Sequence, residues 1–532
     1  MVATGVTMLM MAALLTVGHL ASRSLAAQGE GDALLARLPF SSRWQIAEWV
    51  NQGVDVWEVQ ERYVLAHLTP AQSARLRTEG IALTEEPLPA GYAAYPACYR
   101  TYSDTVAFLR TLSETYPSLV TLFDVGDSWE KTKALSDRDV WAARLTAADV
   151  PGPKPKLFVV AEHHARELIT PEVAMLLASL LTEGYGNDAQ ATWLLNEREV
   201  WVVPMANPDG HVQAEQNEDW RKNTDTDDGD CPGSSSPNSY GVDLNRNYGW
   251  NWGGVGGSPS PCNLTYRGVA AFSEPETQAI RDLVSAQQPD ILISLHSYQD
   301  QILYPWNSTI TPPPDEDGLR ALASRMARYN GYTYGQPSVI LYPVSGDTTD
   351  WAYGTFGIPS YTIEIGGSGD GQFWPPCWRV DTLWGEVRDS LLFAAAAADA
   401  PYDRAHGPDV TALQVATHTL AGGPALTMTA QIRDPDGGGD YVAAAEVSFD
   451  KLAAAGAGQP LTSADGSFDQ ATETVSDALS LAGMAPGSHL LFVRGQDQEG
   501  NWGPPDAARF SVGEHGEQYF LPMMSAATAS SQ

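Results

Sequence analysis

The chain has 532 residues, too many for one ordinary hydrophobic core, so several domains are expected. Hydrophobic residues make up 43% and charged residues 18%, a balance that excludes a disordered chain and a coiled coil. With 65 acidic residues against 31 basic ones, the net charge of −34 argues against nucleic acid or an anionic membrane as a partner.

Residues 1–27 predict a secretory signal peptide. Residues 9–17 form an apolar run, and residues 24–27 (SLAA) offer small-residue cleavage points. The run is short for a membrane helix, but no Lys or Arg precedes it, so an uncleaved membrane anchor is the alternative. We expect a secreted, extracellular protein with no membrane attachment once the signal is removed.

Residues 28–93 are expected to form a small α+β unit. Residues 54–68 mix strand formers with polar residues, and Thr69 followed by Pro70 predicts the cap and first turn of a helix. A glycine ends that helix, and residues 81–84 (IALT) predict a further strand. Because this unit lies between the signal and a larger domain, we expect it to be a propeptide.

Residues 94–400 alternate strand and helix patterns, which predicts an α/β domain around a central sheet. A helix is expected over residues 170–182, with Thr170 as its cap and Pro171 at its first position. In such sheets, ligand sites lie at strand ends and in the loops that follow them. Short apolar runs typical of buried strands are residues 156–161, 199–205, 291–295 and 361–365.

Residues 405–515 predict an all-β sandwich domain, because short strand patterns alternate with turn signals. The only candidate helix there is residues 451–455. Residues 516–532 end in small polar residues and are expected to form a disordered tail. The strand candidates are residues 410–415, 426–432, 445–449, 490–494 and 509–512.

The four cysteines, an even number in a chain expected to be exported, predict two disulfides. Three pairings of Cys98, Cys231, Cys262 and Cys377 are possible. Their spacing contains no Cys-x-x-Cys motif of the zinc-ribbon or redox type.

The sharpest chemical signal is His164-Ala-Arg-Glu167, which lies between a predicted strand and a predicted helix. A His and a Glu three residues apart on a turn can face one ion, and zinc accepts both ligand types while a catalytic site leaves a position for water. A third ligand must come from elsewhere. His296, at the end of another apolar strand, is the best candidate, whereas the side chain of His163 is expected to point the other way.

Glu364 lies inside the apolar run Tyr-Thr-Ile-Glu-Ile, where a carboxylate is costly to bury without a role or a partner. A structural interpretation is a buried ion pair or a strand end turned to solvent. The functional interpretation is a general base that takes a proton from zinc-activated water. Desolvation would raise the pKa of such a carboxyl, and a nearby zinc ion would oppose that shift.

Asn245 and Arg246, in the motif Asp243-Leu-Asn-Arg-Asn, suit recognition of a carboxylate. A guanidinium forks onto both oxygens while an amide donates a further hydrogen bond. Taken alone, an Asn-Arg pair is more often part of a surface loop. Arg221 in Trp220-Arg-Lys is equally uninformative by itself.

These motifs occur together and in order along the main domain. The ordered set resembles the zinc metallocarboxypeptidases related to pancreatic carboxypeptidases A and B, including the bacterial carboxypeptidase T type, over roughly residues 99–395. The motifs are His164-Ala-Arg-Glu, Asn207-Pro-Asp-Gly, Trp220-Arg-Lys, Asp243-Leu-Asn-Arg-Asn, Phe272-Ser-Glu-Pro-Glu, Leu295-His-Ser-Tyr, Tyr342 and Thr362-Ile-Glu.

The resemblance implies a secreted enzyme that releases the C-terminal residue of peptides or proteins, with a mixed central sheet flanked by helices. It implies one zinc ion per chain, bound by His164, Glu167 and His296, with Glu364 as the general base. Arg221 would stabilise the oxyanion of the transition state. The remaining roles implied are binding of the terminal carboxylate by Asn245, Arg246 and Tyr342, and of upstream residues by Arg166, Tyr298 and Phe373.

The family alignment also implies the side-chain pocket and the disulfides. The pocket would include Asn307, Asp347 and Thr349, and Thr349 is neither an acid nor a large aliphatic residue. We therefore expect mixed specificity, for apolar or aromatic residues with some basic ones, unless Asp347 only caps the following turn. The animal enzymes pair the cysteines equivalent to Cys231 and Cys262, which leaves Cys98 to pair with Cys377.

Two departures from the family and several alternatives stay open. Leu168 stands where the family often has Trp, and the N-terminal unit is shorter than the animal inhibitory domain. A peptidase of cell-wall peptides and a non-catalytic binding protein are the alternatives, and a monomer is expected. Calcium could bind at residues 225–230 or 434–440, but plain turns are the favoured interpretation.

Overall fold

The computed structural model describes residues 33–88, 95–216, 219–231, 239–420, 423–434 and 441–513. The predicted signal peptide and the predicted tail lie outside these residues. The chain divides into two compact units, one up to Phe40 plus Val54–Pro89, and one of Ser41–Gly53 plus everything from Ala90. Each unit is described by itself.

The first unit is a four-stranded antiparallel sheet in the order β2-β3-β1-β4, accompanied by the helix α2. The predicted helix start is confirmed, because Thr69 caps α2 and completes a capping box with Gln72. The strand predicted over residues 81–84 is wrong in its bounds, because Ile81 N–H still donates to Leu76 O and closes the helix. The elements are β1 (Leu34–Pro39), β2 (Asp55–Val59), β3 (Tyr63–Leu68), α2 (Pro70–Thr78) and β4 (Thr84–Glu86).

The second unit contains an eight-stranded sheet in the order β11-β10-β12-β9-β7-β8-β6-β5. The central pairs β12-β9, β9-β7 and β7-β8 are parallel, whereas β10-β12, β8-β6 and β6-β5 are antiparallel. The expected mixed sheet is therefore confirmed. Its strands are β5 (Val120–Asp127), β6 (Asp139–Leu145), β7 (Lys156–Ala161), β8 (Glu199–Val203), β9 (Ile291–His296), β10 (Gln301–Leu303), β11 (Thr333–Gly335) and β12 (Ser360–Glu364).

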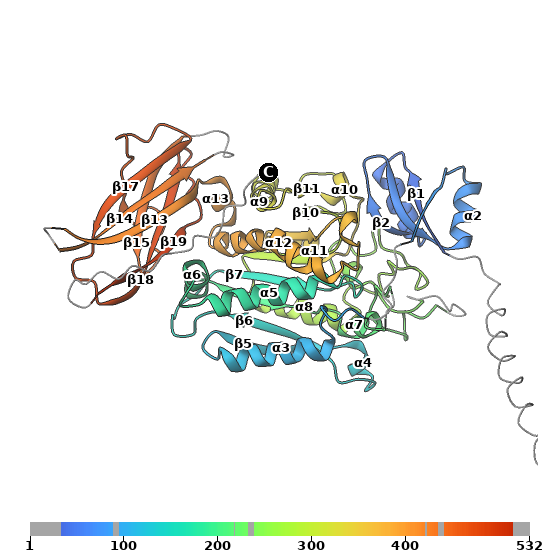
Figure 1. Ribbon diagram of the computed structural model, residues 1–532. Coiled ribbons are helices and arrows are strands. Elements are labelled where there is room, and N and C mark those ends of the chain that lie inside the picture. Colours follow the sequence, from blue (N-terminus) through green and yellow to red (C-terminus); the bar gives the residue numbers. More distant parts are fainter. Residues whose placement is uncertain are drawn as a thin grey trace, which may run out of the picture. The chain divides into compact units, whose positions relative to one another are not determined.

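Helices cover both faces of this sheet (Figure 1), which explains why its central strands are continuous apolar runs. In β7, Leu157 and Val159 enter one core while Phe158 and Val160 enter the other. The first core is lined by α3 (Tyr102–Thr115), α5 (Ile169–Gly184), α6 (Ala189–Glu197), α9 (Glu316–Ala327) and α12 (Cys377–Ala397), and the second by α8 (Pro275–Gln287) and α11 (Thr348–Phe356).

The start of α5 corrects one prediction. The helix begins at Ile169, and Leu168 at the capping position is already helical, with no side-chain cap. Thr170 is therefore not the cap; it lies in the first turn and its hydroxyl donates to Glu167 O at 2.9 Å.

The short helices are α1 (Arg43–Asn51), α4 (Trp129–Thr132), α7 (Pro208–Ala214), α10 (Pro337–Ile340) and α13 (Pro401–His406).

Two further sheets follow the α/β region, as the predicted all-β domain requires: β13-β14-β17 and β16-β15-β18-β19. They enclose a separate hydrophobic core. The predicted helix over residues 451–455 is wrong, because these residues form bends and turns. The strands are β13 (Asp409–Leu420), β14 (Gly423–Arg433), β15 (Val442–Phe449), β16 (Gln459–Pro460), β17 (Thr472–Ser480), β18 (Gly487–Asp497) and β19 (Asp506–Val512).

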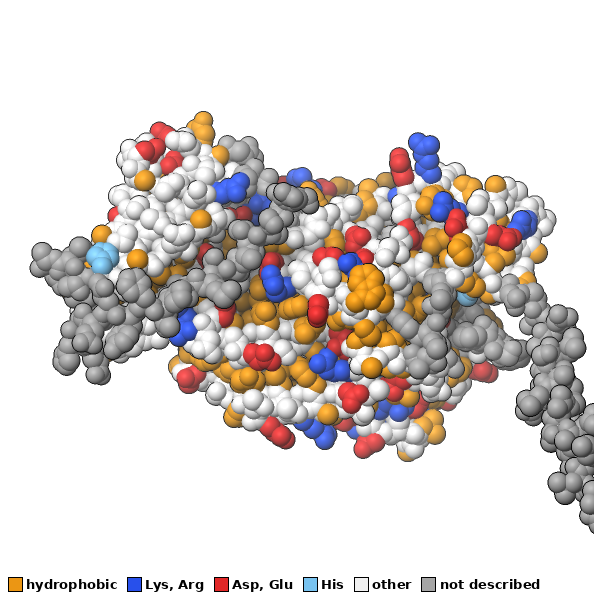
Figure 2. Space-filling view, in the orientation of Figure 1, with side chains coloured by type: hydrophobic (Ala, Val, Ile, Leu, Met, Phe, Trp, Pro, Cys, Tyr) orange, Lys and Arg blue, Asp and Glu red, His pale blue; other side chains and the backbone are white. Residues whose placement is uncertain are grey.

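Figure 2 shows acidic side chains scattered among apolar and basic ones on the face in view. On this face the negative charge is therefore spread out. Among the described residues, none of the helices is both long enough and apolar enough to cross a membrane.

Candidate metal centre and substrate site

Two imidazoles and one carboxylate converge at the carboxyl ends of two central strands of the eight-stranded sheet. His164 and Glu167 follow β7, and His296 ends the neighbouring parallel strand β9, so both strands deliver their carboxyl ends to the same place. Nδ1 of His164 lies 2.7 Å from Oε1 of Glu167, and Nδ1 of His296 lies 3.0 Å from Oε2. The three predicted ligand residues are buried, and one ligand atom of each lies within 4.8 Å of the others.

The hydrogen bonds around these side chains fit a zinc site. Nε2 of His164 lies 3.1 Å from Oδ1 of Asp243, an arrangement that places the proton on Nε2 and leaves the Nδ1 lone pair for a metal. Burial lowers the pKa of His296, and although burial alone would raise the pKa of Glu167, the two histidines lower it well below its usual range. A neutral imidazole and an ionised carboxylate are the forms that bind zinc.

Asp243 links a predicted metal ligand to an arginine. Its Oδ2 accepts from Nε and Nη2 of Arg221 at 3.0 and 2.9 Å, while Oδ1 faces His164. Burial alone would raise the pKa of Asp243, but Arg221, Arg246 and His164 hold it well below its usual range. No sequence pattern predicted a role for this aspartate. Its place in the Asp243-Leu-Asn-Arg-Asn motif was the only available signal.

Glu364 is the last residue of β12 and pairs in register with His296 on β9. Paired residues on adjacent strands point to the same side of a sheet, so the carboxyl group lies on the side of the metal ligands. Its position at a strand end, half-buried, differs from the predicted strand interior. Burial and the Glu167 carboxylate raise the pKa of Glu364 to about 8.

The three residues expected to bind a terminal carboxylate are called here the carboxylate clamp. Asn245 and Arg246 end the short 3-10 helix η1 (Leu244–Arg246), and Tyr342 lies in a loop. Oδ1 of Asn245 accepts from N and Oγ1 of Thr348, and its Nδ2 lies 3.3 Å from Nε2 of His296. Arg246 donates from Nε to Gly256 O at 2.8 Å and from Nη1 to Asn245 O. Among the described residues, no carboxylate oxygen lies within ion-pair distance of Arg246.

Arg166, Tyr298 and Phe373 form a contiguous cluster. The guanidinium carbon of Arg166 lies 4.0 Å from the centre of the Phe373 ring, and the Tyr298 and Phe373 rings meet edge-to-face at 5.1 Å. Arg166 also forms an ion pair with Asp219. The structure therefore brings together the residues expected to bind upstream parts of a substrate.

The three pocket residues also meet. Nδ2 of Asn307 donates to Oδ1 of Asp347 at 2.6 Å and to Oγ1 of Thr349 at 3.0 Å. Asp347 does cap the following helix, because its Oδ1 accepts from Asp350 N. Its Oδ2 and Oδ1 of Asn307 are buried without a hydrogen-bond partner among the described residues.

Further predictions concern residues near the site and the cysteines. His163 does point elsewhere, with Nε2 2.8 Å from the Tyr248 hydroxyl. Oδ1 of Asp225 accepts from the backbone of Asp227 and Asp228, as a plain turn does. Residues 435–440 lie outside the described residues. The expected disulfides Cys231–Cys262 and Cys98–Cys377 both form.

The sequence from residue 105 to 390 matches the family described as zinc carboxypeptidase. The chain belongs to this family. It is 35% identical to zinc carboxypeptidase A 1 of Drosophila melanogaster over 270 residues, 49% of this chain and 59% of that protein. It is 32% identical to carboxypeptidase A2 of Rattus norvegicus over 276 residues, 50% and 62% of the two chains. The chain thus spans about three fifths of the length of these relatives.

The fold agrees with this membership. Carboxypeptidase A from Helicoverpa armigera superposes with a TM-score of 0.59 at 24% identity, covering 70% of this chain and 98% of that one. Thrombin activatable fibrinolysis inhibitor superposes with a TM-score of 0.56, also at 24% identity, covering 70% and 99%. At this identity the likeness concerns the fold alone.

Proposed function

We propose that this protein is a secreted zinc metallocarboxypeptidase that releases one residue at a time from the C-termini of peptides. The observation that carries the proposal is the convergence of two imidazole nitrogens and a carboxylate beside Glu364 and Arg221. Family membership supports the same assignment.

The site residues have complementary roles in this reaction. His164, Glu167 and His296 would hold the zinc ion, which when bound would supply Lewis-acid chemistry for the scissile carbonyl and for water. Glu364 takes a proton from the attacking water and returns it to the leaving amine. Two bonds to Asp243 hold the guanidinium group of Arg221 in one orientation. From there it donates to the developing oxyanion.

The carboxylate clamp accounts for action at chain ends. The Arg246 guanidinium donates to backbone carbonyls through Nε and Nη1, so its charge remains available to a substrate anion. An internal peptide bond has no free carboxylate to present to it. Arg166, Tyr298 and Phe373 would bind residues upstream of the cleaved bond.

Mixed specificity follows from the pocket residues. The buried Oδ2 of Asp347 and Oδ1 of Asn307 are acceptors that a basic side chain would satisfy. Burial raises the pKa of Asp347, and Arg246 lowers it to a smaller extent, so a cationic substrate would favour the ionised form. Thr349 is neither an acid nor a large aliphatic residue, so we expect apolar and aromatic side chains to be accepted as well.

Export and processing complete the proposal. Residues 1–27 would direct secretion, and two disulfides suit an oxidising compartment. The first compact unit would act as a propeptide, so limited proteolysis between it and the zinc carboxypeptidase domain is expected to change activity.

The proposal is tested by a time course of peptide digestion read by mass spectrometry, with and without a zinc chelator. The substrates differ only in their last residue. Stepwise loss from the C-terminus that stops with chelator would support the reaction and report the pocket's preference. Internal fragments would indicate an endopeptidase. A zinc-loaded protein that gives no products would favour a non-catalytic binding protein.

A further inference from the structure

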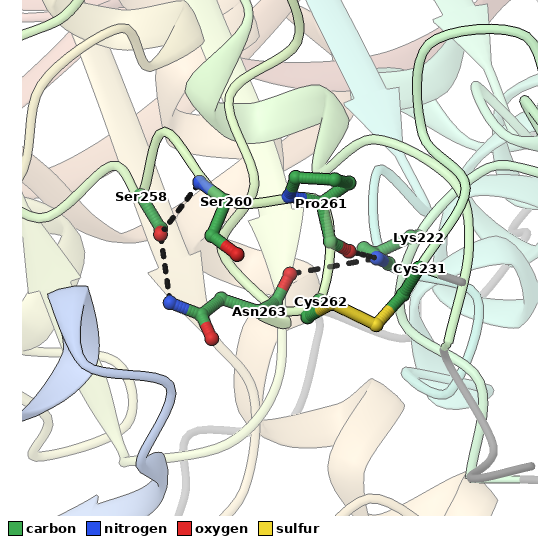
Figure 3. The surroundings of a disulfide bond; sticks show 7 residues. All are labelled: Lys222, Cys231, Ser258, Ser260, Pro261, Cys262 and Asn263. Atoms are coloured by element: carbon green, nitrogen blue, oxygen red, sulfur yellow. Dashed lines mark hydrogen bonds between the residues drawn. A yellow bond between two sulfur atoms is a disulfide. The ribbon is translucent and has the colours of Figure 1, made fainter. Parts of the chain in front are cut away.

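Lys222 is a buried lysine next to Arg221 in the chain, and it has no role in the proposed reaction. Its Nζ donates to Pro261 O at 2.9 Å and to Asn263 O at 3.4 Å (Figure 3). These two carbonyls lie on either side of Cys262, whose sulfur is bonded to Cys231. The ammonium group therefore holds the chain where the disulfide also holds it.

Burial makes this lysine costly, because it lowers the pKa of Lys222 to about 7. The backbone around it is fixed as well: Lys222 O accepts from Nε1 of Trp220 at 2.7 Å and from Nδ2 of Asn207 at 3.0 Å. A lysine kept in such a place requires a structural or functional reason.

The chain that Lys222 holds is a compact loop, residues 256–266, called here the Cys262 segment. Nδ2 of Asn263 and N of Ser260 both donate to the buried hydroxyl of Ser258, at 2.7 and 3.1 Å (Figure 3). Ser258 N in turn donates to Thr265 O at 2.9 Å. Because of these bonds, a displacement near Cys262 would be transmitted through the whole segment.

One end of the Cys262 segment contacts the carboxylate clamp. Gly256 O accepts from Nε of Arg246 at 2.8 Å. Gly256 has a positive φ of 74°, and a Cβ there would lie 2.6 Å from Pro343 O, the residue after Tyr342. The segment therefore lies against both parts of the chain that carry the clamp.

The other end of the segment contacts Asp243. Asp243 N donates to Tyr266 O at 2.8 Å. The Asp243 side chain bonds to Arg221 and His164, neither of which belongs to the segment. The guanidinium of Arg246 thus depends more directly on the segment than the metal ligands do.

We propose that Lys222 is a positioning residue for the carboxylate clamp, acting through the Cys262 segment on Arg246. The proposal rests on the proposed carboxypeptidase function. It assigns Lys222 to substrate affinity and not to the chemical step.

The test compares the full-length protein with its Lys222→Met variant, which keeps the length of the side chain and removes its donor. Lys154→Met is the matched control, because Nζ of Lys154 also donates to backbone carbonyls, those of Ala147 and Leu195, at 2.9 and 3.1 Å. Two quantities are measured: KM and kcat on a peptide with a free C-terminus, and the Kd of an N-acylated dipeptide for the zinc-free protein.

We expect Lys222→Met to raise KM and Kd about five- to tenfold, the effect of losing one or two hydrogen bonds, with kcat changed less than about twofold. Lys154→Met should leave KM and Kd unchanged. Unchanged values in Lys222→Met, equal changes in both variants, or a loss confined to kcat would overturn the proposal.

Two further results keep the outcome decisive. If Lys222→Met does not fold, Ser258→Ala disturbs the same segment and should raise KM in the same direction; an unchanged KM would overturn the proposal. A wild-type protein that binds the dipeptide but cleaves nothing would refute only the reaction, and the Kd values would still decide the role of Lys222. A protein that does neither would overturn both proposals.

Discussion

Asp243 and Arg221 form a buried ion pair in which one carboxylate oxygen accepts two bonds, at 3.0 and 2.9 Å, while the other oxygen faces His164. One side chain therefore orients both a proposed zinc ligand and the residue proposed to stabilise the oxyanion. The ion pair is buried, so solvent does not screen it and its geometry is fixed.

Asp243→Asn should weaken zinc binding about 10- to 100-fold, because a neutral amide supports the His164 ring less well than a carboxylate. Zinc affinity is measured by competition with a chromogenic chelator. Asp209→Asn is the matched control, since Asp209 is also buried and accepts from an arginine, Nε of Arg138, at 2.7 Å. Equal losses in the two variants would show that Asp243 has only a general structural role.

Glu364→Gln should lower kcat by about 10³-fold, the usual contribution of a general base, while zinc stays bound. The amide fills the same space but cannot accept a proton. Turnover is measured together with zinc content on the same preparation. Near-normal activity in a zinc-loaded variant would remove Glu364 from the role of base.

The enzyme's kcat/KM should fall at acidic pH. A base must be deprotonated, so kcat/KM falls as pH drops through the pKa of Glu364. Burial raises the pKa of Glu364 from 4.5 to about 8, and the charge of a bound zinc ion would lower it again. The pH at which kcat/KM falls by half should therefore lie between 4.5 and about 8. Initial rates with one peptide across this range check the expectation, which a flat profile down to the lower value would contradict.

Arg246→Ala should raise KM for peptides with a free C-terminus about 10- to 100-fold, because a charge-assisted hydrogen-bonded pair is lost. Amidated peptides should be poor substrates of the wild type and should respond little to the substitution. Rates on matched free and amidated peptides measure both effects. If the wild type cleaved the two forms equally, the clamp would have no role in substrate choice.

Asp347→Asn should reduce the preference for C-terminal Lys or Arg over Phe about tenfold, since the pocket loses its negative charge. Competition between peptides that differ only in the last residue gives the ratio of kcat/KM values. Asp350→Asn is the control, because Asp350 is also a buried carboxylate but accepts from the backbone N–H groups of Asn307 and Ser308. An unchanged ratio in Asp347→Asn would leave Asp347 only its role as a helix cap.

Much of the central sheet could be predicted from local pattern. The strands β7, β8, β9 and β12 are continuous apolar runs because both faces of the sheet are covered. Each run can be recognised from its own short segment of sequence. The strands β5 and β17 are among those that were not predicted, because they contain neither a continuous apolar run nor a regular alternation of polar and apolar residues. Their pairing depends on neighbours far along the chain.

By itself, the sequence determined the residue types of the site and the strand ends that carry them, because ligand chemistry and hydrophobic periodicity are local properties. Only the tertiary structure decided which side chains meet. His164 and His296 are 132 residues apart, yet their Nδ1 atoms lie 3.2 Å from one another because β7 and β9 are adjacent parallel strands. The contacts of Asp243 with Arg221 and of Lys222 with backbone carbonyls likewise result from chain packing, and no sequence motif predicts them.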